Sequence, residues 1–354
     1  MKGRAAPELV HSPHRQLYPL RRTTPKGSAD PGWKRIGWDE ALGETAQQLA
    51  AIRAESGAEA VAFSITTPSG TPLSDSIDWI ERLVRHFGSP NICYGTEICN
   101  WHKDFAHAFT FGCGMPPADY ENADTILLWG HNPANTWLAQ ANAIGRGRAR
   151  GAKMVVVDPR RSETAAIADQ HMFVRPGQDA ALLFGLLNTL FEEGLTRTTE
   201  LALDGIEEVR ASIAAFTAEA MSDRCGVPAE QIRQLARDFA AADKAVCYGR
   251  MGVSTQAFGT LCQWLVQLIN LVTGNLDRVG GALCTEPAVD LVETTSGGHF
   301  AAWHSRVSQL PEYGGELPVA ALAEEMLEPG EGQVRALITV AGNPVLSTPN
   351  GRKL

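Results

Sequence analysis

The chain has 354 residues, of which 44% are hydrophobic and 20% are charged. This composition excludes a disordered or fibrous chain, and the length predicts two or three lobes rather than one domain. The 40 acidic and 31 basic residues give a net charge of −9. This charge argues against nucleic acid as a partner, because nucleic-acid-binding proteins are usually basic.

The sequence also bears on membrane insertion and on the cellular compartment. No run of about 20 apolar residues is present, so we expect no direct membrane insertion. The first residues, Met1-Lys2-Gly3-Arg4, lack the apolar stretch of a signal peptide. The seven scattered cysteines include no Cys-x-x-Cys pair, and they match neither a disulfide framework nor a complete local zinc or iron–sulfur motif. A reducing, cytoplasmic location is therefore expected.

The first part of the chain predicts an arm followed by an α/β unit. Residues 1–38 are polar and rich in turn-forming residues, so little regular structure is expected there. A helix is predicted from Trp38, with Asp39 near its positive N-terminal end. Residues 60–65 predict a strand with small or apolar side chains on both faces, as in a buried parallel strand. A second helix is predicted over 74–87.

Strands and helices alternate along the rest of the chain. Apolar runs predict strands, and helical periodicity predicts the helices between them. The predicted strands are 125–130, 152–158, 245–249 and 334–340, and the predicted helices are 135–148, 179–193, 229–242 and 259–273. This alternation is typical of an α/β fold of doubly wound, Rossmann-like lobes with mostly parallel sheets.

An Asn-Pro pair follows two of the predicted strands. One is in Gly130-His131-Asn132-Pro133 and the other is in Ala341-Gly342-Asn343-Pro344. Chance explains two copies, because Asn-Pro is a common opener of turns. The alternative is a pair of related lobes that each present a strand-end loop to a ligand, since open α/β sheets bind ligands at the carboxyl ends of their strands.

Two further strand-end segments carry polar side chains. In Asp158-Pro159-Arg160-Arg161, the acid could accept hydrogen bonds from a ribose or a base and the arginines could pair with phosphates, although Pro159 also suits a simple helix entry. In Arg175-Pro176-Gly177-Gln178-Asp179, Asp179 could be a helix N-cap. The glycine-rich segment 145–151 follows a helix and precedes a strand, which is the reverse of a dinucleotide-binding motif, so we expect a solvated turn.

The densest polar cluster spans residues 91–102 and contains Cys99, with His102 and His107 close in sequence. A thiolate can bind a transition metal or act as a nucleophile beside a histidine. The alternative for any single cysteine is a small buried hydrophobic residue.

In chain order, these segments form a set that is more specific than any one of them. The set comprises Lys2-Gly3-Arg4, His11-Ser12-Pro13, Tyr18-Pro19-Leu20, the stretch from Trp33 to Leu42, Trp129 to Pro133, Val157 to Arg160 with Thr164, Pro176 to Asp179, Thr273 to Leu276 and Gly280-Gly281. It resembles the molybdopterin oxidoreductases of the dimethyl-sulfoxide-reductase superfamily, in particular members like formate dehydrogenase and polysulfide reductase. The resemblance covers essentially the whole chain.

The resemblance implies a cofactor of molybdenum or tungsten held by two molybdopterin guanine dinucleotides. Cys99 would be the protein ligand to the metal, and Lys2 would lie between a pterin and a 4Fe-4S cluster. The chain would be a portion of a catalytic subunit that carries out two-electron redox chemistry on a small substrate, with an iron–sulfur subunit as electron-transfer partner. By position, the dinucleotides would be bound by Gly130, Asn132, Pro133, Asp158, Arg160, Thr164, Gly177 and Asp179 in one lobe and by Gly342, Asn343 and Pro344 in the other.

The resemblance also implies discontinuous domains. Residues 1–38 would be the remnant of an iron–sulfur arm, 39–94 plus 295–354 a truncated first α/β lobe, and 95–294 a central Rossmann-like lobe that binds a dinucleotide. We expect a fragment, because no helix follows the strand 334–340 to cover it. The cysteines that bind the 4Fe-4S cluster in full-length relatives are absent.

Two departures argue against formate oxidation, and two other functions stay open. Asn100 stands where formate dehydrogenases usually have histidine, and the helix with Gln263 and Trp264 lacks the arginine that those enzymes direct at formate. One alternative function is a non-catalytic remnant that at most binds the pterin nucleotide. The other is a nicotinamide-dependent dehydrogenase, which is disfavoured because no Gly-x-Gly-x-x-Gly follows a predicted strand.

Overall fold

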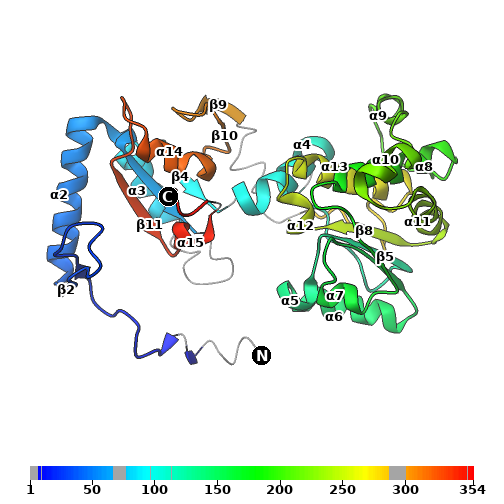
Figure 1. The fold of residues 1–354 in the computed structure, drawn as a ribbon, viewed down its shortest axis with the longest axis horizontal. Helices are drawn as coiled ribbons and strands as arrows, with labels where there is room; N and C mark the ends of the chain where they lie inside the picture. The colour runs from blue at the N-terminus through cyan, green and yellow to red at the C-terminus, as the bar shows by residue number, and fades with distance from the viewer. Residues whose placement is uncertain are drawn as a thin grey trace. The chain divides into compact units, whose positions relative to one another are not determined.

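The computed structural model describes residues 7–8, 10–66, 77–95, 97–112, 114–286, 300–348 and 350–354. The chain divides into two compact units, which are drawn in Figure 1. Unit 1 comprises Met1–Tyr94 and Phe300–Leu354, and unit 2 comprises Gly95–His299. No helix among these described residues is long and apolar enough to cross a bilayer.

The core of unit 1 is a three-stranded parallel sheet. Its strands are β3 (Val61–Ile65), β4 (Ile92–Tyr94) and β11 (Ala336–Val340), in the order β11-β3-β4. β11 and β3 pair in full, from Ala336 opposite Val61 to Val340 opposite Ile65. β3 is the central strand of the three, so it is buried on both faces.

Side chains of β3 alternate between two hydrophobic clusters, as the sequence predicts. Phe63 and Ile65 pack on the side of the sheet that contacts α2 (Trp38–Ser56) and α3 (Ile77–Phe87). Ala62 packs with the opposite cluster, which includes α14 (Leu322–Leu327). The remaining elements of unit 1 are β1 (Leu20–Arg21), β2 (Lys34–Arg35), η1 (Ala58–Ala60), β9 (Phe300–His304), β10 (Pro311–Tyr313), η5 (Val319–Ala321) and α15 (Pro344–Ser347).

Unit 2 contains a four-stranded sheet in which all strands are parallel. The strands are β5 (Thr125–Trp129), β6 (Lys153–Val157), β7 (Gln170–Met172) and β8 (Ala245–Gly249), in the order β7-β6-β5-β8. The chain moves outward from β5 to β7 and then returns to place β8 on the other side of β5. The topological switch point of this doubly wound sheet therefore lies between β5 and β8, where such sheets bind ligands.

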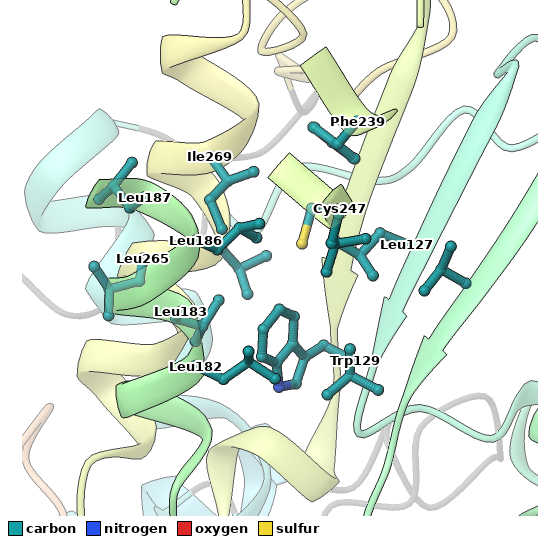
Figure 2. Close-up of a cluster of buried hydrophobic side chains, with 14 of the residues drawn as sticks. Leu127, Trp129, Leu182, Leu183, Leu186, Leu187, Phe239, Cys247, Leu265 and Ile269 are labelled. Carbon is teal, nitrogen blue, oxygen red and sulfur yellow. The ribbon is translucent and has the colours of Figure 1, made fainter. Parts of the chain in front are cut away.

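Helices cover both faces of the unit 2 sheet. In Figure 1, α6 (Leu138–Ala149) lies on one face, and α8 (Asp179–Glu192), α11 (Ala229–Ala241) and α13 (Gly259–Val272) lie on the other. Figure 2 shows leucines of α8 and α13 packed against Leu127, Trp129 and Cys247 of the sheet. The other elements are η3 (Glu97–Phe105), α4 (Ala106–Phe111), α5 (Pro133–Thr136), α7 (Glu163–Ala166), α9 (Ile206–Ile213), α10 (Ala218–Cys225) and α12 (Met251–Ser254).

The free edge of β8 is closed by a side chain. Asn270 on α13 donates from Nδ2 to the Cys247 carbonyl at 2.8 Å and accepts from the Cys247 N–H at 2.8 Å. The Ala245 N–H donates to the Asn275 side chain at 3.1 Å. Amide side chains thus replace a neighbouring strand, so buried backbone groups at this edge have partners.

The α/β class and the mostly parallel sheets are confirmed, with several local differences. The predicted helix 135–148 is two helices, α5 and α6, interrupted at Trp137, whose φ of −149° is not helical. The predicted solvated turn 145–151 is wrong, because α6 continues to Ala149 and Gly147 is buried. A Cβ at Gly147 would overlap the Tyr120 carbonyl, so this glycine permits close packing rather than phosphate binding.

Candidate cofactor-binding site

The backbones that follow β5 and β8 touch at the switch point of unit 2. Gly130 has a φ of +53°, and its carbonyl accepts a hydrogen bond from Gly252 N at 3.0 Å. A Cβ at Gly130 would overlap the backbone nitrogen of Val253. Gly130 therefore adopts a left-handed conformation and also lets the two backbone segments approach closely. A residue with a side chain could do neither without strain.

Asn132 and Thr164, both predicted to bind the cofactor, are hydrogen-bonded to each other. Asn132 Oδ1 accepts from Thr164 Oγ1 at 2.7 Å and from Thr164 N at 3.2 Å, while Asn132 Nδ2 donates to Glu163 at 2.7 Å. Thr164 is buried and Asn132 is half-buried. This pair fixes the loop after β5 against the start of α7, so its first role is to hold two strand-end loops together.

The loop after β6 carries an aspartate and an arginine that solvent can reach. Asp158 is half-buried, and its Oδ1 accepts from the Arg160 backbone N at 2.8 Å, which shapes the turn. The Arg160 guanidinium is exposed and lies 3.9 Å from the carboxylate of Glu163. Both predicted residues are accessible at the carboxyl end of the sheet.

Asp179 is buried at the start of α8 rather than acting as its N-cap, which is Gln178. Its two carboxylate oxygens accept from Trp129 Nε1 at 2.8 Å and Gln256 Nε2 at 2.9 Å. Burial raises the pKa of Asp179, and the two donors oppose that shift. The carboxylate thus links the end of β5, the start of α8 and the segment after α12. Nearby Gly177 is exposed, with a φ of +76°.

His131 lies between Gly130 and Asn132 and is buried. Burial lowers its pKa to about 4, although a hydrogen bond to Gln140 raises it, and the positive charge of Arg250 lowers it further. His131 is therefore neutral near pH 7. Its ring also packs 5.7 Å from the ring of Tyr248, between centroids.

In unit 1 the second Asn-Pro pair forms the same turn. Asn132 has φ −119° and ψ 72°, and Asn343 has φ −125° and ψ 90°. Each precedes a proline that opens a one-turn helix, α5 or α15. Each asparagine carbonyl accepts from the backbone and the hydroxyl of the fourth residue beyond it, which is Thr136 or Ser347.

The left-handed position of this turn is also repeated, with a different residue. Gly130 follows β5 with a φ of +53°, and Ala341 follows β11 with a φ of +58°. Gly342 therefore corresponds to His131, not to Gly130. A Cβ at Gly342 would overlap the hydroxyl of Thr66 at the end of β3, so this glycine allows two strand ends to come together.

Cys99 lies on η3, a π-helix of nine residues. Its thiol is exposed, whereas the nearby Lys103 and His107 are buried. η3 packs against α12 and α13, which places Cys99 in the part of unit 2 that surrounds the switch point. π-Helical turns are rare and frequent at functional sites.

Two of the predicted roles involve a metal or an electron path. The part of the chain that the structure describes has no group of three or more His, Cys, Asp or Glu side chains placed to hold a metal. Cys99 is the metal ligand that we predict from the sequence. Lys2 lies outside the described residues.

Comparisons with known proteins place the chain in a family. The profile of the molybdopterin oxidoreductases matches residues 15–354. Formate dehydrogenase H from Escherichia coli K12 is 30% identical over 272 residues, which are 73% of this chain and 36% of that protein. The thiosulfate reductase molybdopterin-containing subunit PhsA of Salmonella typhimurium LT2 is also 30% identical, over 79% of this chain and 36% of its own length.

This chain belongs to the molybdopterin oxidoreductase family. Acetylene hydratase from Pelobacter acetylenicus has the same fold, with a TM-score of 0.81 and 24% identity over 100% of this chain and 52% of that one. The chain thus spans about a third to a half of the length of these relatives. Its relatives are molybdopterin enzymes, and a molybdenum or tungsten pterin is the cofactor that membership implies.

The residues present fit a pterin cofactor that carries phosphate. The carboxyl ends of β5, β6, β7 and β8 meet along one edge of the sheet. At that edge the half-buried Asp158 has a carboxylate suited to amino and hydroxyl groups, and the exposed Arg160 has a guanidinium suited to phosphates. Sequence reasoning missed Arg250 and Gly252, which are the first and third residues after the predicted strand 245–249.

Proposed function

We propose that this molybdopterin oxidoreductase chain is a portion of a catalytic subunit that binds two molybdopterin guanine dinucleotides carrying molybdenum or tungsten. The observation that supports the proposal is the duplicated Asn-Pro turn, with matching backbone angles at Asn132 and Asn343. Each turn follows the carboxyl end of a parallel strand, which is where open α/β sheets bind ligands. Two equivalent turns suit two equivalent ligands.

Each strand-end loop of unit 2 has a role in this proposal. Asp158 would accept hydrogen bonds from the base or ribose, and the exposed Arg160 would pair with phosphate. Gly130, Pro133 and Gly177 would let the backbone approach the ligand. Asn132, Thr164 and Asp179 would act by fixing the loops, because their side chains are already bonded to protein groups. Gly342, Asn343 and Pro344 would serve the second dinucleotide.

Cys99 would be the protein ligand to the metal. A thiolate is a soft ligand that suits a metal already bound by sulfur, and the exposed Cys99 thiol is available on η3. The bound group would supply two-electron redox chemistry on a small substrate. In the complete protein, Lys2 would lie between a pterin and a 4Fe-4S cluster, with an iron–sulfur subunit as the electron-transfer partner in the cytoplasm.

Metal and nucleotide analysis tests the proposal. The full chain is co-expressed with the cofactor assembly proteins and purified. Mass spectrometry is then used to measure molybdenum and tungsten, and chromatography to measure the GMP released by acid. We expect one metal and two GMP per chain. A chain with neither metal nor GMP would be a non-catalytic remnant, and saturable NADH binding in its place would indicate a nicotinamide dehydrogenase.

X-ray absorption at the metal edge tests the role of Cys99. We expect Cys99→Ala to lose one sulfur ligand from the metal while GMP content and the far-UV spectrum stay unchanged, because the thiol is exposed. Cys284→Ala is the matched control in the same unit, and it should leave the metal coordination intact. An identical sulfur count in wild type and Cys99→Ala would remove Cys99 from the metal site.

A further inference from the structure

Arg250 is the first residue after β8 and lies at the switch point of unit 2. Its backbone N–H donates to the Trp129 carbonyl at 3.1 Å, which joins the ends of β8 and β5. Two residues later, Gly252 makes the close backbone contact with Gly130. The Arg250 side chain therefore extends from the part of the sheet where doubly wound folds bind ligands.

Neutral groups hold the Arg250 side chain. Its Nη1 lies 3.4 Å from the hydroxyl of Tyr248 and 3.8 Å from the sulfur of Met115. The guanidinium carbon lies 5.0 Å from the ring centroid of Trp137, which is a cation–π distance. Trp137 is 41% exposed, so this pair lies at the surface rather than in the core.

The charge of Arg250 has no acidic partner among the described residues. By contrast, Arg233 and Arg237 on α11 are paired with glutamates. The positive charge of Arg250 also contributes to lowering the pKa of the neighbouring His131. A half-buried cation held only by neutral groups is suited to an anion that arrives from solution.

Charges are arranged along the strand ends in a way that matches a nucleotide. Asp158 follows β6, on the side of β5 away from β8, and Arg250 follows β8. A carboxylate suits the amino and hydroxyl groups of a base and ribose, and a guanidinium suits phosphates. A nucleotide lying across these strand ends would place its base beside Asp158 and its diphosphate beside Arg250.

We propose that Arg250, positioned by Trp137 and Tyr248, pairs with the diphosphate of the nucleotide bound at the switch point of unit 2. This inference rests on the proposed function and names the cation for one of its two dinucleotides. Arg250 is the binding group. Trp137 and Tyr248 act through it, by restricting the guanidinium to one orientation and so reducing the entropy lost on binding.

Titration of the full chain with GDP, as a probe of the nucleotide, tests this inference by calorimetry. We expect Arg250→Gln to weaken GDP binding about 10- to 100-fold, the range for a lost charge-assisted hydrogen bond. Arg250→Lys should recover part of the loss, because the charge stays but the planar fork does not. Tyr248→Phe should weaken binding less than Arg250→Gln does.

Arg210→Gln is the control, because the Arg210 guanidinium likewise lies over an aromatic ring, that of Phe191 at 5.9 Å, but Arg210 is exposed and lies on α9. It should leave GDP binding within twofold of wild type. If wild type binds GDP and Arg250→Gln, folded by circular dichroism, binds it equally well, this inference is wrong and the proposed function stands. If wild type binds no GDP and carries no GMP, both are wrong.

Discussion

The turns after β5 and β11 have the same backbone and very different surroundings. β5 is paired on both sides and every one of its residues is buried, whereas β11 pairs with β3 and its residues are half-buried or exposed. The Asn132 side chain is bonded to Thr164 and Glu163. The Asn343 side chain is exposed and has no hydrogen-bond partner among the described residues.

The comparison separates what local sequence determines from what packing determines. Asn-Pro sets the turn in both units, because proline fixes its own φ and restricts the residue before it. Packing then determines the surroundings of the turn. In unit 2 the turn is hydrogen-bonded to a neighbouring loop, and in unit 1 it is exposed. Substitutions at equivalent positions should therefore have unequal effects.

The largest contrast should occur at the left-handed position. We expect Gly130→Ala to lower the free energy of unfolding by at least about 4 kcal/mol, because it adds the cost of positive φ to an overlap with the Val253 backbone. Ala341→Gly should change it by less than about 1 kcal/mol, because relief of strain and loss of chain rigidity oppose each other. Urea unfolding of both variants measures the difference, and equal effects would contradict the comparison.

The edges of the two sheets provide the second contrast. Asn270→Leu should destabilise unit 2 by about 3 kcal/mol, because the Cys247 N–H and carbonyl lose their partners. β11 has no such side-chain cap among the described residues. The control is Gln267→Leu on the same helix, which should cost less because it removes only the 3.0 Å bond that Gln267 Oε1 accepts from Asn270 Nδ2, while the buried Gln267 Nε2 already lacks an acceptor. A larger loss for Gln267→Leu in thermal unfolding would show that the Asn270 cap contributes little.

The third contrast is the pH dependence of His131, whose counterpart Gly342 has no titratable group. The folded pKa of about 4 lies below the unfolded value of 6.5, so the contribution of His131 to stability is complete above 6.5 and decreases as pH falls toward 4. At pH 5 the loss should be about 2 kcal/mol relative to pH 8. His131→Gln should lack this part of the pH dependence, and parallel stability curves for variant and wild type would disprove the assignment.

The smallest contrast concerns the asparagine side chains. Asn132→Ala should cost about 1 to 2 kcal/mol, because Thr164 is buried and loses its acceptor. Asn343→Ala should change stability by less than about 0.5 kcal/mol, since its side chain is exposed. Chemical denaturation of the two variants should rank them in this order.

Much of the fold could be predicted because its strands are uniformly apolar. Residues 125–129 and 245–249 are all buried, and such short apolar runs between turns are readily recognised. β7 was missed because its three residues, Gln170–Met172, include polar side chains. The π-helix that carries Cys99 could not be predicted, since its sequence is equally compatible with an α-helix.

The candidate site was less accessible to sequence analysis. The interruption at Trp137 accompanies a contact with Arg250, which is distant in the sequence and is brought close only by the pairing of β5 and β8. The bonding of Asn132 to Thr164 and of Asp179 to Trp129 likewise depends on tertiary structure. Motifs located the strand ends, but they could not distinguish a residue that contacts a ligand from one that fixes a loop.

The insertion of unit 2 between β4 and β9 has a consequence for biosynthesis. Val61 of β3 pairs with Ala336 of β11, so the unit 1 sheet cannot close until β11 has been translated. At ~5–20 residues per second, this delay is on the order of 15 to 60 seconds. Unit 2 is continuous in sequence and can fold during that time. The nascent chain would then expose the apolar β3 longer than any other strand, which makes it the segment that most needs a chaperone.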